Sequence, residues 1–135
     1  MTLFTSDIKK INFKTIIIFI CATIFLIIFN AIYSLFSHGV SSNAMIYAFV
    51  YPLVGVIVYT LLFFINWYDR VSYNLLNASI ATISTGSILL GVNEIAGADT
   101  SYYKLFYLTA YILCGISILY PIIKFIIKKH KGCDL

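Results

Sequence analysis

The sequence predicts an all-α fold, a single integral membrane bundle of four transmembrane helices with both termini in the cytoplasm. Three observations predict it. Of the 135 residues, 61% are hydrophobic and only 10% are charged, whereas about a quarter of the residues in a water-soluble domain are charged. Four apolar runs, at about 15–36, 44–66, 72–92 and 102–127, each supply the roughly 20 helical residues that cross a bilayer. The positive charges lie between those runs in a pattern that indicates the topology.

Eight of the nine lysine and arginine residues fall on one side of the predicted topology. They are Lys9, Lys10 and Lys14 before the first run, Arg70 between the second and third, and Lys124, Lys128, Lys129 and Lys131 at the end. Segments rich in these residues stay in the cytoplasm, and the opposite segments hold Lys104 alone. We therefore expect a multi-pass protein of the cell membrane. Because anionic lipid head groups explain the net charge of +4, the lipid bilayer is the expected partner and nucleic acid is not.

The four spans use almost the whole chain, so residues 1–135 are predicted to form one domain with no separate soluble part. Three lysines before an apolar run resemble a signal peptide, but the run continues to about Phe36 without a convincing cleavage site. We expect it to be retained as the first helix. The three cysteines, Cys21, Cys114 and Cys133, are far apart and form no C-x-x-C pair, so they are interpreted as plain thiols.

The first two predicted spans are joined by an outer turn at 37–43. The first span is rich in isoleucine and phenylalanine, and its strongly polar interior side chain is Asn30. Serines at the end of the turn can cap the second helix by accepting a free backbone N–H. Pro52 and Gly55 lie in the outer half of the second span, where a proline frees a carbonyl and predicts a local bend.

The third predicted span is unusually polar for a membrane helix. At 100° per residue, Asn74, Ala78, Ala81 and Thr85 share one face, with Asn77 and Ser84 at its edge. Such a face is costly in lipid, so we expect it to point into the bundle. The fourth span is longer than a bilayer requires, which predicts a tilt or a bend at Pro121.

These features together suggest a polar cavity that opens to the outside. Tyrosines recur every four residues on the second and fourth spans and supply both hydroxyls and aromatic faces. The predicted lining comprises Asn30, Tyr59, Asn74, Asn77, Ser84, Thr85, Tyr107 and Tyr111, with His38, Glu94 and Asp99 near the outer mouth. The alternative is that the tyrosines form an interfacial belt and the small polar side chains only pack helices together.

Two small-x-x-x-small pairs on the third span predict close helix packing. They are Thr82 with Gly86 and Ser87 with Gly91. Such pairs let two helix backbones approach. The contact is predicted to lie within the monomer, and a seam between two copies is the alternative.

The sequence favours no catalytic, metal or cofactor site. No serine–histidine or cysteine–histidine arrangement is evident, and His38, Glu94 and Asp99 lack the spacing of metal ligands. Proton-driven transport is disfavoured because no ionisable side chain lies deep in a span.

The leading hypothesis is a small transport or channel-like protein. The alternative is an accessory, docking or protective subunit of a larger membrane complex. A homo-oligomer is compatible with either hypothesis, and the basic tail can anchor the chain or bind an anionic lipid.

Overall fold

The structure is a computed structural model that describes residues 2–37, 40–65, 69–98 and 100–131. It consists of helices: α1 (Thr2–Phe36), α2 (Asn43–Ile46), α3 (Val50–Ile65), α4 (Arg70–Ala96) and α5 (Tyr103–Lys131). Within the described ranges, four helical segments are long and apolar enough to cross a membrane, namely Lys9–Phe36, Asn43–Ile65, Arg70–Ala96 and Tyr103–Lys124. The prediction of an all-α membrane protein with four spans is therefore confirmed. The chain is a small polytopic membrane protein.

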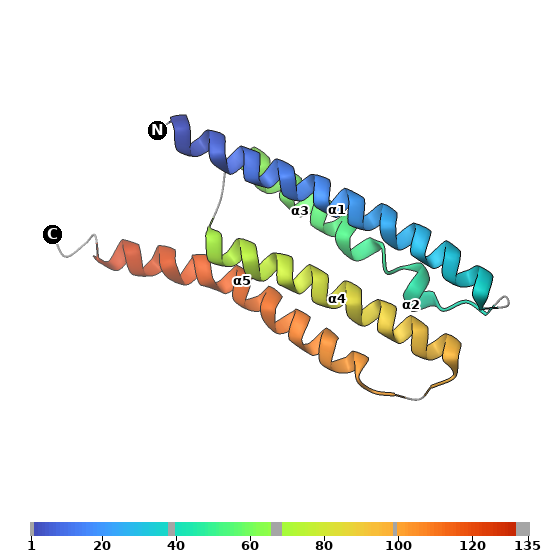
Figure 1. Cartoon of the computed structure of the whole chain (residues 1–135). Helices are drawn as coiled ribbons and strands as arrows, with labels where there is room; N and C mark the ends of the chain where they lie inside the picture. Colours follow the sequence, from blue (N-terminus) through green and yellow to red (C-terminus); the bar gives the residue numbers. More distant parts are fainter. Residues whose placement is uncertain (1, 38–39, 66–68, 99, 132–135) are drawn as a thin grey trace.

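The helices form two hairpins that lie side by side. Helix α1 packs along α3, and α4 packs along α5, while α2 and α3 join the two hairpins by contacting α4. The start of α1 and the end of α5 lie at the same end of the bundle (Figure 1). We call this the termini end, and the opposite end, where α1 leads to α2 and α4 leads to α5, the loop end.

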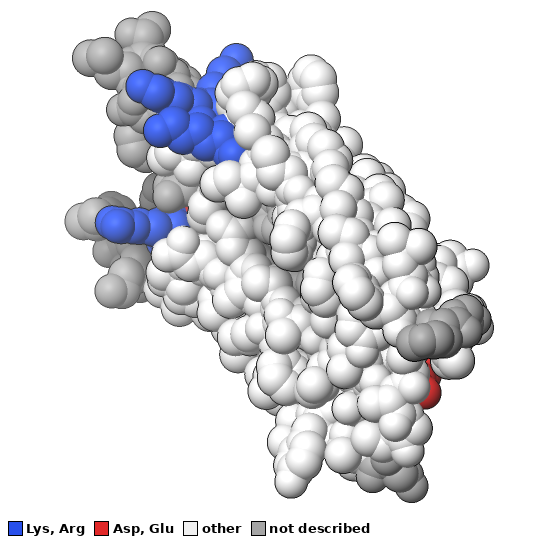
Figure 2. Space-filling model, turned by 45° about the vertical axis from the view of Figure 1, so that its right-hand side comes forward, with Lys and Arg blue, Asp and Glu red and all other residues white. Residues whose placement is uncertain are grey.

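Positively charged side chains gather at the termini end. Figure 2 shows lysine and arginine gathered at one end of the molecule and acidic atoms at the other. The described cations of the termini end are exposed and include Lys9, Lys10, Lys14, Arg70 and Lys124. Between the ends the visible surface is uncharged, as expected for a surface that contacts lipid.

The second span is broken where a bend was expected, but the break precedes Pro52. Helix α2 ends at Ile46 and α3 begins at Val50, with a turn between them. Proline has no N–H, and its ring clashes with the carbonyl four residues earlier, which here belongs to Ala48. The interruption therefore falls at the turn, and Pro52 occupies the first turn of α3, where proline is tolerated.

Helix α4 has a defined cap at each end. Its N-cap residue, Asp69, accepts a hydrogen bond from the backbone N–H of Ser72 (3.3 Å). Its C-cap is Gly97, whose φ of 65° is left-handed and favours glycine. Helix α5 passes through Pro121 without interruption.

The face of α4 that was expected to point inward points outward. Asn74, Ala78, Ala81 and Thr85 are all exposed, so that prediction is wrong. The buried residues of α4 are Ser72, Ser79, Ile80, Gly86, Ser87 and Gly91. Five of these six residues are serine or glycine, which let helices pack closely whether or not the side chain is polar.

Two glycines set the closest contacts of α4. A Cβ placed on Gly86 would lie 2.8 Å from the Cβ of Phe106 on α5. A Cβ on Gly91 would lie 2.6 Å from the Cβ of Met45 on α2. Both distances are below normal carbon–carbon contact. Glycine at these positions therefore allows α4 to approach its neighbours on two sides.

Candidate functional site

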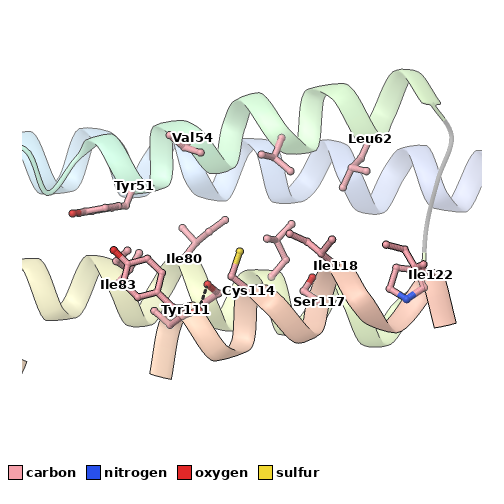
Figure 3. A pocket seen from close by; sticks show the side chains of 15 residues that line it. Tyr51, Val54, Leu62, Ile80, Ile83, Tyr111, Cys114, Ser117, Ile118 and Ile122 are labelled. Atoms are coloured by element: carbon pink, nitrogen blue, oxygen red, sulfur yellow. Dashed lines mark hydrogen bonds between the residues drawn. The ribbon is translucent and has the colours of Figure 1, made fainter. Parts of the chain in front are cut away.

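A lateral groove of about 600 Å³ runs between α3 and the α4–α5 hairpin. In Figure 3, Val54 and Leu62 of α3 point across it toward residues of α4 and α5. The full lining is Tyr51, Val54, Val58, Leu62, Leu76, Ser79, Ile80, Ile83, Ala110, Tyr111, Cys114, Ser117, Ile118, Pro121 and Ile122. The volume lies within the range of small-molecule sites.

The groove presents carbon to its interior even where hydroxyl groups line it. The hydroxyl of Ser79 donates to the backbone carbonyl of Ala110 (2.8 Å). The hydroxyl of Ser117 donates to the carbonyl of Ser72 (2.8 Å). Each serine thus uses its donor to join α4 to α5, so the groove wall offers an apolar guest a surface whose hydroxyl protons are already engaged.

The two ends of the groove differ. Toward the loop end, the lining includes Tyr51 of α3 and Tyr111 of α5. Toward the termini end, the lining finishes at Pro121 and Ile122, one turn before Lys124. The ammonium of Lys124 donates to Asp69 Oδ1 (2.6 Å) while 63% of its side chain is exposed. This hydrogen bond holds the pKa of the Asp69 carboxyl below its usual value. One end of the groove is therefore lined by tyrosines, and the other lies beside a cation.

A separate polar cluster lies where α1, α3 and α4 meet. Tyr59 is 0% exposed, and its hydroxyl donates to Asn77 Oδ1 (2.7 Å). Its ring stacks on Phe19 of α1, with 5.6 Å between the ring centroids. Nearby, the hydroxyl of Thr15 hydrogen-bonds to that of Tyr73. These contacts join the first hairpin to α4 with buried polar groups that satisfy one another.

Asn12 and Ser72 are buried polar side chains whose polar atoms have no hydrogen-bond partner among the described residues, and Asn12 is the larger of the two. Asn12 is 0% exposed, and neither Nδ2 nor Oδ1 has a hydrogen-bond partner in the part of the chain that the structure describes. Because Asn12 precedes the first apolar run, its burial could not be predicted from the sequence. The amide reduces stability, because a buried unpaired polar group costs about 1–3 kcal/mol.

The residues predicted to line a polar cavity do not converge. Tyr111 is 65% exposed and lines the groove, whereas Tyr59 and Asn77 pair with each other on a different face of the bundle. Asn74 and Thr85 are exposed, and Asn30 on α1 is half-buried. The hydroxyl of Ser84 donates to the carbonyl of Ile80 within α4. Tyr107 is half-buried, and its ring lies edge-on to that of Tyr103. The predicted polar lining is therefore wrong as a single surface.

The predicted outer mouth is described in part. His38 and Asp99 lie outside the described residues. Glu94 is exposed, and its carboxylate accepts a hydrogen bond from the hydroxyl of Ser42, the N-cap residue of α2. Among the described residues, no three histidine, cysteine or acidic side chains are grouped to hold a metal ion. Glu94 thus has a structural contact that joins α4 to α2.

The predicted packing residues lie at different contacts. Gly86 faces α5, and Gly91 faces α2. The hydroxyl of Ser87 donates to the carbonyl of Ala44 (2.6 Å). Thr82 instead donates to the carbonyl of Ala78 within α4 (2.7 Å). Three of the four residues therefore contact other helices of the same chain.

No known family, curated protein or solved structure matches this chain.

Proposed function

We propose that this protein is a non-catalytic accessory protein of the membrane that binds an apolar guest from the bilayer in the groove between α3 and α5. The observation that carries the proposal is the groove itself, about 600 Å³ in volume and lined mainly by carbon. Apolar clefts between helices are common ligand sites. A guest with few polar groups matches a wall whose serine hydroxyls donate to backbone carbonyls.

The same geometry argues against a polar pathway. A conduit for ions or polar solutes needs polar groups in series along the bundle. In the described part of the chain, Tyr59 and Asn77 form a hydrogen bond with each other. Asn74 and Thr85 are exposed on the outside of the bundle. Transport is therefore the weaker of the two functions predicted from the sequence.

We further propose that the termini end lies in the cytoplasm. Five cations whose side chains are described gather there, namely Lys9, Lys10, Lys14, Arg70 and Lys124. The described charged residues of the loop end are Glu94 and Lys104. Lysine and arginine accumulate on the cytoplasmic side of membrane proteins. The groove then opens toward the cytoplasmic leaflet.

Native mass spectrometry of protein extracted in mild detergent tests guest binding. We expect a population with one retained guest, which is lost in Cys114→Phe and Val58→Phe because both side chains line the groove. The matched control is Ile116→Phe on the lipid-facing side of α5, which is already 45% exposed. Circular dichroism confirms that each variant retains its helices.

A guest kept equally by all three variants would locate binding elsewhere and overturn the proposal. Solute flux into liposomes gives a second readout. We expect no flux above that of protein-free vesicles. A flux that Asn77→Leu abolishes would establish a pathway through the polar cluster instead.

A further inference from the structure

We infer that the guest is an anionic phospholipid of the leaflet at the termini end, with one hydrocarbon chain in the groove and its phosphate beside Lys124. This inference rests on the proposed function and adds the chemistry of the ligand. Three properties of the groove support it: its cross-section, its depth and the cation at one end.

The groove is wide enough for a hydrocarbon chain. The lining extends from Tyr51 to Leu62 on α3, which is roughly 17 Å at a helical rise of 1.5 Å per residue. A volume of about 600 Å³ over that length gives a mean cross-section of about 35 Å². One hydrocarbon chain with neighbours at 4.0–4.5 Å occupies about 20 Å², so it fits without separating α3 from α5.

The depth of the groove corresponds to one leaflet. Half of a 30 Å hydrocarbon core is about 15 Å, close to the groove length of roughly 17 Å estimated from the helical rise. The groove begins near the termini end, because Leu62 is close to the end of α3 at Ile65. The lining of α3 ends at Tyr51, and Tyr111 of α5 lies at the same end of the groove. A chain that enters from the termini end therefore reaches the tyrosines near the middle of the bilayer.

Lys124 is placed to contact a phosphate at the open end. It follows Pro121, a lining residue, by one helical turn, and 63% of its side chain is exposed. Its ammonium has three N–H donors. The pair with Asp69 leaves donors for a second anion, and cations near the membrane surface attract anionic lipids.

A lipid titration tests the inference. Delipidated protein in detergent is titrated with phosphatidylglycerol and with phosphatidylcholine of the same chains, and native mass spectrometry counts the bound lipids. We expect one phosphatidylglycerol, bound about fivefold more tightly than phosphatidylcholine, the factor that one surface cation supplies. Lys124→Gln should reduce this preference to less than twofold. Asp69→Asn breaks the same ion pair but keeps the cation, so it should preserve or increase the preference.

The possible results distinguish failure of the lipid inference from failure of the proposed function. Equal binding of the two lipids, or a preference unchanged by Lys124→Gln, overturns the anionic ligand but leaves an apolar guest in the groove. A lipid preference that survives Cys114→Phe places the lipid outside the groove and overturns the inference. If neither lipid binds and a membrane protein co-purifies with the wild type but not with Cys114→Phe, the occupant of the groove is a partner helix and the lipid inference is overturned. Loss of every guest from the wild-type protein overturns both proposals.

Discussion

Gly91→Ala offers the sharpest test of how the two hairpins are joined. The new Cβ would lie 2.6 Å from Met45 Cβ and 3.1 Å from both Met45 Cα and the Met45 backbone nitrogen. Normal carbon contacts are 3.5–4.0 Å, and rotation of the Met45 side chain cannot move its own backbone or Cβ. Helix α2 must therefore shift away from α4.

The expected cost follows from two opposing effects. Overpacking of a well-packed site costs about 1–3 kcal/mol, and alanine returns about 0.5–1 kcal/mol through its better helix propensity. A shift of α2 also weakens the hydrogen bond from Ser87 to the carbonyl of Ala44. We expect the free energy of unfolding to fall by about 1–2 kcal/mol, since overpacking outweighs propensity.

Unfolding by sodium dodecyl sulfate in mixed micelles, followed by circular dichroism, measures this change. Gly115→Ala is the matched control, because nothing lies within 4 Å of the added Cβ. It should leave the free energy of unfolding unchanged or raise it slightly. Equal stability of the two variants would show that α2 does not pack on α4 at Gly91, and the account of the hairpin junction would be refuted.

Three further predictions concern polar groups. Asn12→Leu should raise the free energy of unfolding by about 1–3 kcal/mol, because it removes an unpaired buried amide; a lower stability would reveal a partner for that amide. A double-mutant cycle of Tyr59→Phe and Asn77→Leu should give a coupling of about 0.5–1.5 kcal/mol for their hydrogen bond, and additive effects would contradict that bond. Because the bond from Lys124 lowers the pKa of Asp69 below its ordinary 3.8, this carboxylate stabilises the fold fully above that value and loses its effect as pH falls through the lowered one. Asp69→Asn, which retains a capping oxygen, should therefore be less stable than the wild type at pH 7, and the difference should shrink as the pH falls through the lowered pKa of Asp69. A difference in stability that does not change with pH would contradict this linkage.

The helical spans could be predicted because apolar length alone determines them. The polar residues of α4 did not indicate which of its faces points into the bundle. Asn74 and Thr85 were expected inside because they are polar, but close packing selected Ser79 and Gly86, which are small. Polarity alone therefore does not indicate which face of a membrane helix meets its neighbours, because serine and glycine both allow close packing.

The groove could not be predicted because it depends on how far apart α3 and α5 lie. Cys114 and Val58 are ordinary apolar residues in the sequence, and only the arrangement of the two hairpins turns them toward one cavity. Tyr59 did carry a signal, since a tyrosine deep in a span needs a partner. Its pairing with Asn77 shows that this need is met by packing between helices.

Photo-crosslinking with a phospholipid that carries a diazirine on its hydrocarbon chain tests the groove most directly. The protein is reconstituted in vesicles that contain a small fraction of this lipid, irradiated and mapped by peptide mass spectrometry. We expect adducts to concentrate on groove residues such as Val58, Cys114 and Ile118. Adducts spread evenly over lipid-facing positions such as Ile24 and Ile116 would contradict a guest held in the groove.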